Sequence, residues 1–127
     1  MNDEQYLNYC QTQLKTFAGE FCQRTETLAE NDSLQELALA FAELAKGERD
    51  LYEDGPGLVS RLFVTYPDFA PTFPRDLLWF LGGECLHFMP DDEIEQHQQL
   101  AGLREDAAAR GEQLNFTAAR AKLLKLQ

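Results

Sequence analysis

The sequence lacks the features that most directly reveal a protein's location. It has no apolar run of about 18 residues, so we expect no membrane-spanning helix. Its first residues contain neither a basic segment nor an apolar one, so we expect no secretory signal and a cytoplasmic protein. Its three cysteines form no Cys-x-x-Cys pair, and we expect them to be reduced and mostly buried.

Basic residues are scarce. The 11 lysines and arginines stand against 22 acidic residues, which gives a net charge of −11. Because such a surface repels phosphate groups, we expect no nucleic-acid partner and no anionic membrane partner. The exception is segment 115–127, which carries Arg120, Lys122 and Lys125 and no acidic residue. This segment could dock on an acidic surface of the same chain or of a second copy.

Motifs of catalysis and cofactor binding are also missing. The chain has no Gly-x-Ser-x-Gly and no glycine-rich phosphate loop, and its two histidines are too far apart for a His-x-x-x-His pair. We interpret Gly55-Pro56-Gly57 as a turn that stops a helix. It is not a phosphate-binding loop, because no strand precedes it and no lysine follows it. We therefore expect no cofactor.

The pattern of apolar residues predicts an all-α fold. The 127 residues suffice for one domain, residues 1–127, and show no alternating strand pattern. Apolar residues recur at spacings of three and four, which predicts a single compact bundle of five to six helices. The expected helices span residues 3–29, 33–47 or 33–53, 58–66, 74–89, 90–110 and 115–127. The residues expected at helix ends are Asn2 with Gln5, Ser33 with Glu36, Gly47, Pro67, Gly111, and Asn115 or Thr117.

We expect the most apolar segment, 74–89, to form the central helix, preceded by a proline-rich aromatic loop at 66–74. The Gly82-Gly83 pair within this helix indicates either the close approach of another helix or a local break. The prolines of the loop remove backbone donors and stiffen it. Phe69 and Phe73 either plug the core or stand exposed. In the second case they form a contact site for a partner together with Tyr66, with Trp79 as their anchor in the core. A stiff aromatic loop has little conformational entropy to lose on binding.

A weaker group of candidates contains a thiol and both histidines: Cys85, His87 and His97. These residue types bind zinc or iron, or serve as nucleophile and base. Their spacing argues against a site, because Cys85 and His87 would point to different sides of a helix and Pro90 separates His87 from His97. No metal site is therefore expected.

These observations favour a small acidic protein-interaction module, such as an adaptor, a chaperone-like protein or a regulatory factor, with an unidentified protein partner. One alternative is an enzyme or metal-binding protein that uses Cys85, His87 and His97. A second is a self-associating protein, in which the heptad-like apolar seam of the first helix or the basic last helix joins two copies. A third is an acidic mimic of nucleic acid.

Overall fold

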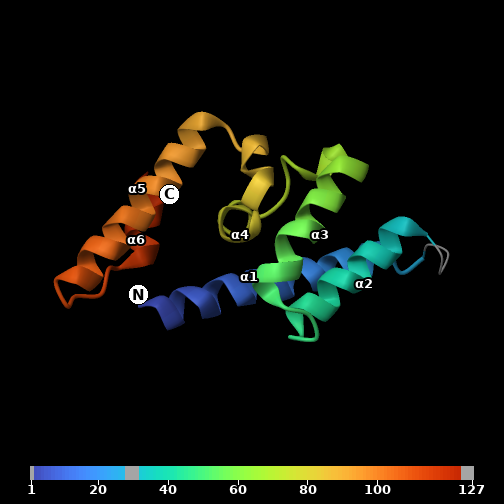
Figure 1. The fold of residues 1–127 in the computed structure, drawn as a ribbon, viewed down its shortest axis with the longest axis horizontal. Coiled ribbons are helices and arrows are strands. Elements are labelled where there is room, and N and C mark those ends of the chain that lie inside the picture. The colour runs from blue at the N-terminus through green and yellow to red at the C-terminus, as the bar shows by residue number, and fades with distance from the viewer. Residues whose placement is uncertain (1, 28–31, 124–127) are drawn as a thin grey trace. The chain divides into compact units, whose positions relative to one another are not determined.

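The computed structural model describes residues 2–27 and 32–123 (Figure 1). These residues form six α-helices and two 3₁₀ helices, without a strand, so the all-α prediction is confirmed. The elements are α1 (Asp3–Thr25), α2 (Ser33–Ala45), α3 (Leu51–Thr65), η1 (Pro67–Phe69), α4 (Arg75–Leu81), η2 (Gly83–Phe88), α5 (Asp91–Ala109) and α6 (Phe116–Leu123). None of the helices in this part of the chain is long and apolar enough to cross a membrane.

The fold divides into two compact units. The larger unit spans Cys10–Phe88 and contains most of α1, together with α2, α3, α4 and both 3₁₀ helices. The smaller unit combines Met1–Tyr9 with Met89–Gln127, and so contains the first turns of α1 together with α5 and α6. That residues 1–127 act as one domain stays a prediction.

Reciprocal hydrogen bonds begin α1, as the sequence predicted. The backbone N–H of Gln5 donates to Asn2 Oδ1 at 2.8 Å, and the N–H of Asn2 donates to Gln5 Oε1 at 3.0 Å. At the other end α1 stops at Thr25, earlier than expected. Residues 28 and 29, the last of the expected helix, lie outside the described residues.

The start of α2 differs from the prediction by one residue. Asp32, not Ser33, is the N-cap, and its carboxylate accepts a hydrogen bond from the N–H of Leu34 at 2.9 Å. Aspartate is at least as good an N-cap as serine, so the capping-box pattern selected the wrong neighbour. The Ser33 hydroxyl is instead 2.6 Å from the Tyr66 hydroxyl. The C-terminal end agrees with the prediction, because Gly47 follows the helix with φ +81°.

The prediction that Gly55-Pro56-Gly57 stops a helix is wrong, because all three residues lie inside α3. The helix begins earlier, at an Asp50 N-cap whose carboxylate accepts from the N–H groups of Tyr52 and Glu53 at 2.9 and 2.8 Å. Two capped donors fix the first turn. Pro56 lies inside the helix, where it removes one backbone donor, so the well-capped first turn helps α3 to tolerate it.

Gly55 has a packing role instead. A Cβ atom built there would lie 2.8 Å from a methyl carbon of Leu81, so glycine lets α4 pack closely against α3. At its far end α3 is followed by Tyr66 as C-cap and by Pro67, the residue expected to end it.

The apolar segment expected as one central helix is two. α4 ends at Leu81 and the 3₁₀ helix η2 starts at Gly83, whose φ is +50°. A Cβ atom at Gly82 would collide with the carbonyl oxygen of Leu78. The glycine pair therefore permits a break that other residues would resist. The segment is central to its unit, since Leu77, Leu78 and Leu81 of α4 are buried.

An aromatic cluster fills the core of the larger unit. The Phe17 ring lies 4.7 Å from Phe73 and 5.3 Å from Phe41, and Phe63 lies 5.4 Å from Phe73, between ring centroids. These rings come from α1, α2, α3 and the loop before α4, and the edge-on and tilted arrangements favour aromatic pairing. The heptad-like seam of α1 thus contributes to the core, with Cys10, Leu14 and Phe21 also buried.

The smaller unit is held by contacts between the first turns of α1 and its two C-terminal helices. Phe116 packs edge-on against Tyr6 and Tyr9, at 5.6 and 5.3 Å between centroids. The Arg104 guanidinium lies 4.1 Å from the Tyr6 ring centroid and donates to Asp3 at 2.7 Å. The expected helix ends are confirmed. Asn115 accepts from the N–H of Ala118 at 3.1 Å, and Gly111 follows α5 with φ +71°.

Candidate functional site

The aromatic loop 66–74 is anchored to the core of the larger unit. Phe73 is only 1% exposed. Phe69 and Tyr66 are half-buried, and the Phe69 ring centroid lies 5.4 Å from that of Phe21. Arg75 fastens the loop by donating to the carbonyl oxygen of Ala70 at 2.8 Å. The core-plug interpretation therefore describes Phe73.

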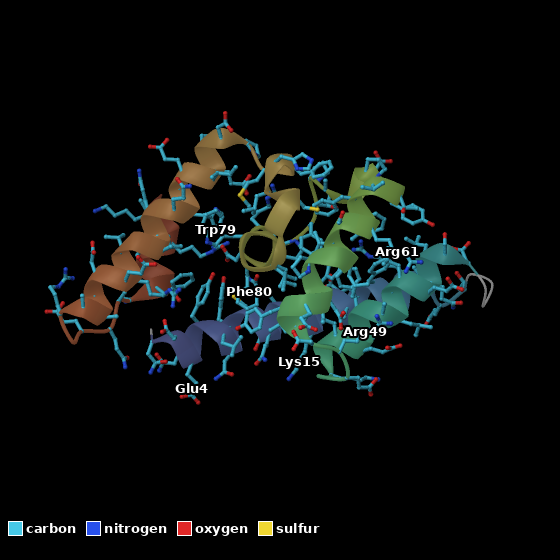
Figure 2. All side chains as sticks on the ribbon, in the orientation of Figure 1. Glu4, Lys15, Arg49, Arg61, Trp79 and Phe80 are labelled. Carbon is cyan, nitrogen blue, oxygen red and sulfur yellow. The ribbon has the colours of Figure 1, made fainter. Side chains whose placement is uncertain are left out.

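The expected contact between Phe73 and a partner does not fit the structure, because the Phe73 ring is enclosed by other phenylalanines. The idea that the loop binds a partner stays a prediction and depends on Tyr66 and Phe69. Trp79, the expected core anchor, is half-buried on α4 rather than part of the core (Figure 2).

The three residues considered for metal binding occupy different environments. Cys85 and His97 are buried, whereas His87 is exposed with its ring 4.3 Å from the Phe88 ring. His97 Nδ1 lies 2.9 Å from the carbonyl oxygen of Glu93. Over residues 2–27 and 32–123, no group of three histidine, cysteine or acidic side chains is placed to hold a metal ion. All three cysteines are free thiols.

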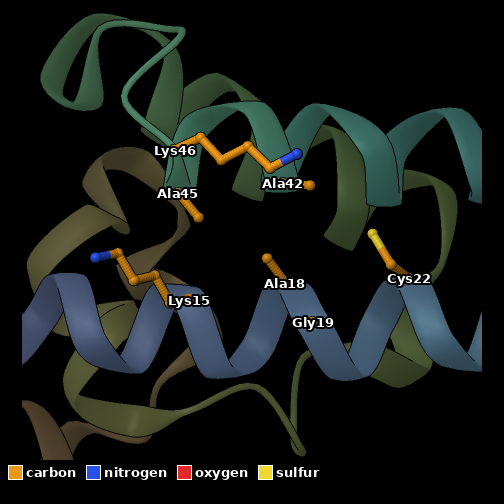
Figure 3. Close-up of a pocket in the computed structure, with 7 residues that line it drawn as sticks. All are labelled: Lys15, Ala18, Gly19, Cys22, Ala42, Ala45 and Lys46. Atoms are coloured by element: carbon orange, nitrogen blue, oxygen red, sulfur yellow. The ribbon is translucent and has the colours of Figure 1, made fainter.

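The structure shows a candidate site that the sequence analysis did not single out, a groove between α1 and α2 (Figure 3). Its volume is about 450 Å³. Small apolar residues form its floor, and lysines and a cysteine stand at its ends. The lining residues are Lys15, Ala18, Gly19, Cys22, Ala42, Ala45 and Lys46.

The groove follows from the unequal size of the side chains between the two helices. On the core side, Phe17 and Phe21 of α1 meet Phe41 of α2 at centroid distances of 5.3 and 6.0 Å. These rings hold the helix backbones apart. On the outer side, alanines and a glycine are too short to fill the space. A Cβ atom at Gly19 would meet nothing within 4 Å.

Two further hollows continue the groove along the antiparallel helices. One shares Gly19 and Cys22 with it and extends toward Glu26 and Gln35. The other shares Lys15, Ala45 and Lys46 with it and extends toward Gln11 and Arg49. The three hollows thus form one continuous trough. The Cys22 thiol, half-buried in this trough, donates to the carbonyl oxygen of Ala38 at 3.4 Å.

Comparison with known proteins adds one result. The family model described as PA2817-like matches residues 4–127. The chain belongs to the PA2817-like family. No curated protein and no solved structure matches it. The family description names no activity, so the function of this PA2817-like chain has to be argued from the geometry of the groove.

Charge is distributed unevenly along the groove of the PA2817-like chain. Lys15 and Lys46 leave the two helices near one end of the groove, and their side chains point in opposite directions along it, with the Lys46 amine beside Ala42 (Figure 3). Arg49 lines the hollow that continues from this end. Arg49 is already paired with Glu43 at 3.0 Å. Neither lysine forms an ion pair with the described residues, and no acidic residue lies three or four positions from Lys15 on α1. Glu26 lines the opposite end.

The sequence did contain signals for this groove. Gly19 interrupts a strong helical pattern, and alanines alternate along 38–45. The alanines suggest close helix packing, but the phenylalanines on the other side hold the two helix backbones apart. Sequence spacing shows which residues are small, but whether small residues close a gap or leave one depends on the large residues beside them.

Proposed function

We propose that this protein is an interaction module that binds a protein partner in the groove between α1 and α2. The observation that carries the proposal is the groove itself, an apolar hollow of about 450 Å³ with two lysines at one end that make no ion pair with the described residues. Apolar surface left open in this way favours association, because covering it removes that surface from water.

The glycine in the groove supports the same conclusion. Gly19 lies in the interior of α1, where glycine costs about 1 kcal/mol relative to alanine. Nothing in the fold requires it, since the space beside it is empty. An occupant whose backbone comes close to α1 would account for a glycine at this position.

Crosslinking in the cell tests this function. A photoreactive amino acid replaces Leu39, which lines the trough on α2 and is 53% exposed, so the floor of the groove stays open. In a control it replaces Val64, which is 74% exposed on α3 of the same unit. We expect a discrete protein adduct from position 39 under illumination and none of the same mass from position 64. Identical adduct patterns from the two positions, or no adduct from position 39, would overturn the proposal.

The same experiment addresses self-association, the alternative occupant. An adduct with twice the mass of the chain would show that a second copy fills the groove. A heavier or lighter adduct would identify a different protein, whose crosslinked peptide can be sequenced by mass spectrometry.

A further inference from the structure

We infer that the occupant of the groove is one amphipathic helix of a partner protein, with acidic side chains at the end that meets Lys15 and Lys46. This inference rests on the proposed function, and specifies the partner's secondary structure, charge and direction.

The length of the trough matches a helix. The α1 residues that line it run from Gln11 to Thr25. At a rise of about 1.5 Å per residue they span about 20 Å, the length of a helix of about four turns. The floor of alanine and glycine lets a third helix approach α1 and α2 closely, in the manner of ridges packed into a groove.

Backbone hydrogen bonding favours a helix over an extended peptide. The walls of the trough are helices whose backbone groups are bonded within themselves. An extended peptide lying there would find no row of backbone donors and acceptors, and its own would lose water without gaining partners. A helix satisfies its backbone internally and needs only an apolar face.

The shape of the trough also argues against a small apolar ligand. Small-molecule sites enclose most of the ligand's surface. This trough is open to solvent between the two helices, and its successive hollows continue along the helix pair.

Charge sets the direction of the bound helix. Lys15 and Lys46 offer two cations on a chain whose net charge is −11, so an acidic partner meets attraction at that end and repulsion over much of the rest. The negative C-terminal end of a helix dipole also favours cations. We therefore place the C-terminal end of the partner helix at the two lysines. Its N-terminal end lies near Glu26, which makes it antiparallel to α1.

Two designed peptides test this direction by fluorescence anisotropy with the full chain. Each is a labelled 15-residue helix with the same composition and the same leucine and alanine face. One carries two glutamates in its last turn, and the other carries them in its first turn. We expect the first peptide to bind about fivefold more tightly at low salt, as two partly exposed ion pairs would give, and the difference to shrink at high salt.

Variants locate the binding on the structure. Lys15→Glu with Lys46→Glu should abolish or reverse the preference between the two peptides. Gly19→Leu should remove binding of both, because its side chain fills the floor. Gly102→Leu is the matched control, since it is also a helix-interior glycine with open space around a Cβ, on α5. It should leave binding unchanged.

The outcomes separate this inference from the proposed function. Equal binding of the two peptides would overturn the assigned direction. No binding of either peptide, together with a protein adduct from position 39 in the cell, would overturn the acidic helix and leave the interaction module standing. A lipid recovered from the purified chain, with neither peptide binding nor protein adduct, would overturn both.

Discussion

The two units of this chain are stabilised in different ways. The larger unit buries most of the apolar side chains and joins three helices and a loop through a continuous phenylalanine cluster. In the smaller unit α5 has no continuous apolar face and is polar over most of its surface. The described apolar residues that are buried there are Met89, Leu100, Ala107 and Phe116.

In the smaller unit, contacts between side chains at the surface add to the small apolar core. A cation over an aromatic ring, a charged hydrogen bond and edge-on rings connect α1 to its C-terminal helices. Such contacts contribute less than a packed core, and exposed ion pairs weaken with salt. We therefore expect most of the stability to come from Cys10–Phe88, the unit that also contains the groove. A rigid unit can keep an apolar trough open because its core does not depend on filling it.

The largest expected effect comes from emptying the phenylalanine cluster. Phe73→Ala should destabilise the larger unit by about 3–5 kcal/mol, because it removes a fully buried ring and leaves a cavity. Hydrogen exchange resolved by peptide should show lost protection throughout α1, α2 and α3. Phe116→Ala, the same change in the smaller unit, should expose only α5, α6 and the start of α1. Equal loss of protection over the whole chain from both variants would contradict the contrast between units.

The second effect concerns the start of α3. Asp50→Ala should cost about 1–2 kcal/mol in urea unfolding, since one carboxylate caps two N–H groups of a helix that also contains a proline. Asp32→Ala removes a cap with one such bond from α2 and should cost less. Asp50→Asn should retain most of the stability. A larger cost at Asp32 than at Asp50 would show that Pro56 does not make α3 dependent on its cap.

The helix ends show how far the sequence determined this fold. Asn2, Gly47, Gly111 and Asn115 were predicted correctly, because capping depends on residues a few positions apart. The prediction of a turn at Gly55-Pro56-Gly57 was wrong. These residues have low helix propensity, but the Asp50 cap and the packing of Gly55 against Leu81 stabilise the helix around them. The break at Gly82-Gly83 was one of the outcomes the glycines allowed, and only packing decides it.

The candidate site was harder to predict than the fold. Aromatic and proline residues drew attention to loop 66–74, but the buried ring of Phe73 belongs to the core. The groove is made of alanine and glycine, residue types without distinctive chemistry, brought together from two helices. Only the three-dimensional structure shows that the phenylalanines on the other side hold those helices apart.

A third, smaller effect distinguishes two glycines of the larger unit. Gly19→Ala should stabilise the unit by about 0.5–1 kcal/mol, because alanine is the better helix former and its Cβ meets open space. Gly47→Ala should destabilise it by about 1 kcal/mol, because φ at Gly47 is +81°. Thermal unfolding checks both. If Gly19→Ala lowered the melting temperature, the groove would not be empty in the free protein.

The smallest effect probes the surface contacts that hold the smaller unit. Arg104→Ala should cost about 1 kcal/mol, from the loss of the guanidinium over Tyr6 together with its hydrogen bond to Asp3. Asp3→Asn should change little, because the Asp3 side chain is 98% exposed and water screens its charge. Arg104→Lys keeps the charge but loses the flat group that stacks on the ring, so it should fall between wild type and Arg104→Ala. Unfolding at low and high salt separates the two contributions, since the ion pair weakens with salt and the stacked ring contact persists. A cost for Asp3→Asn as large as that for Arg104→Ala would show that charge pairing, and not packing on the ring, holds this unit together.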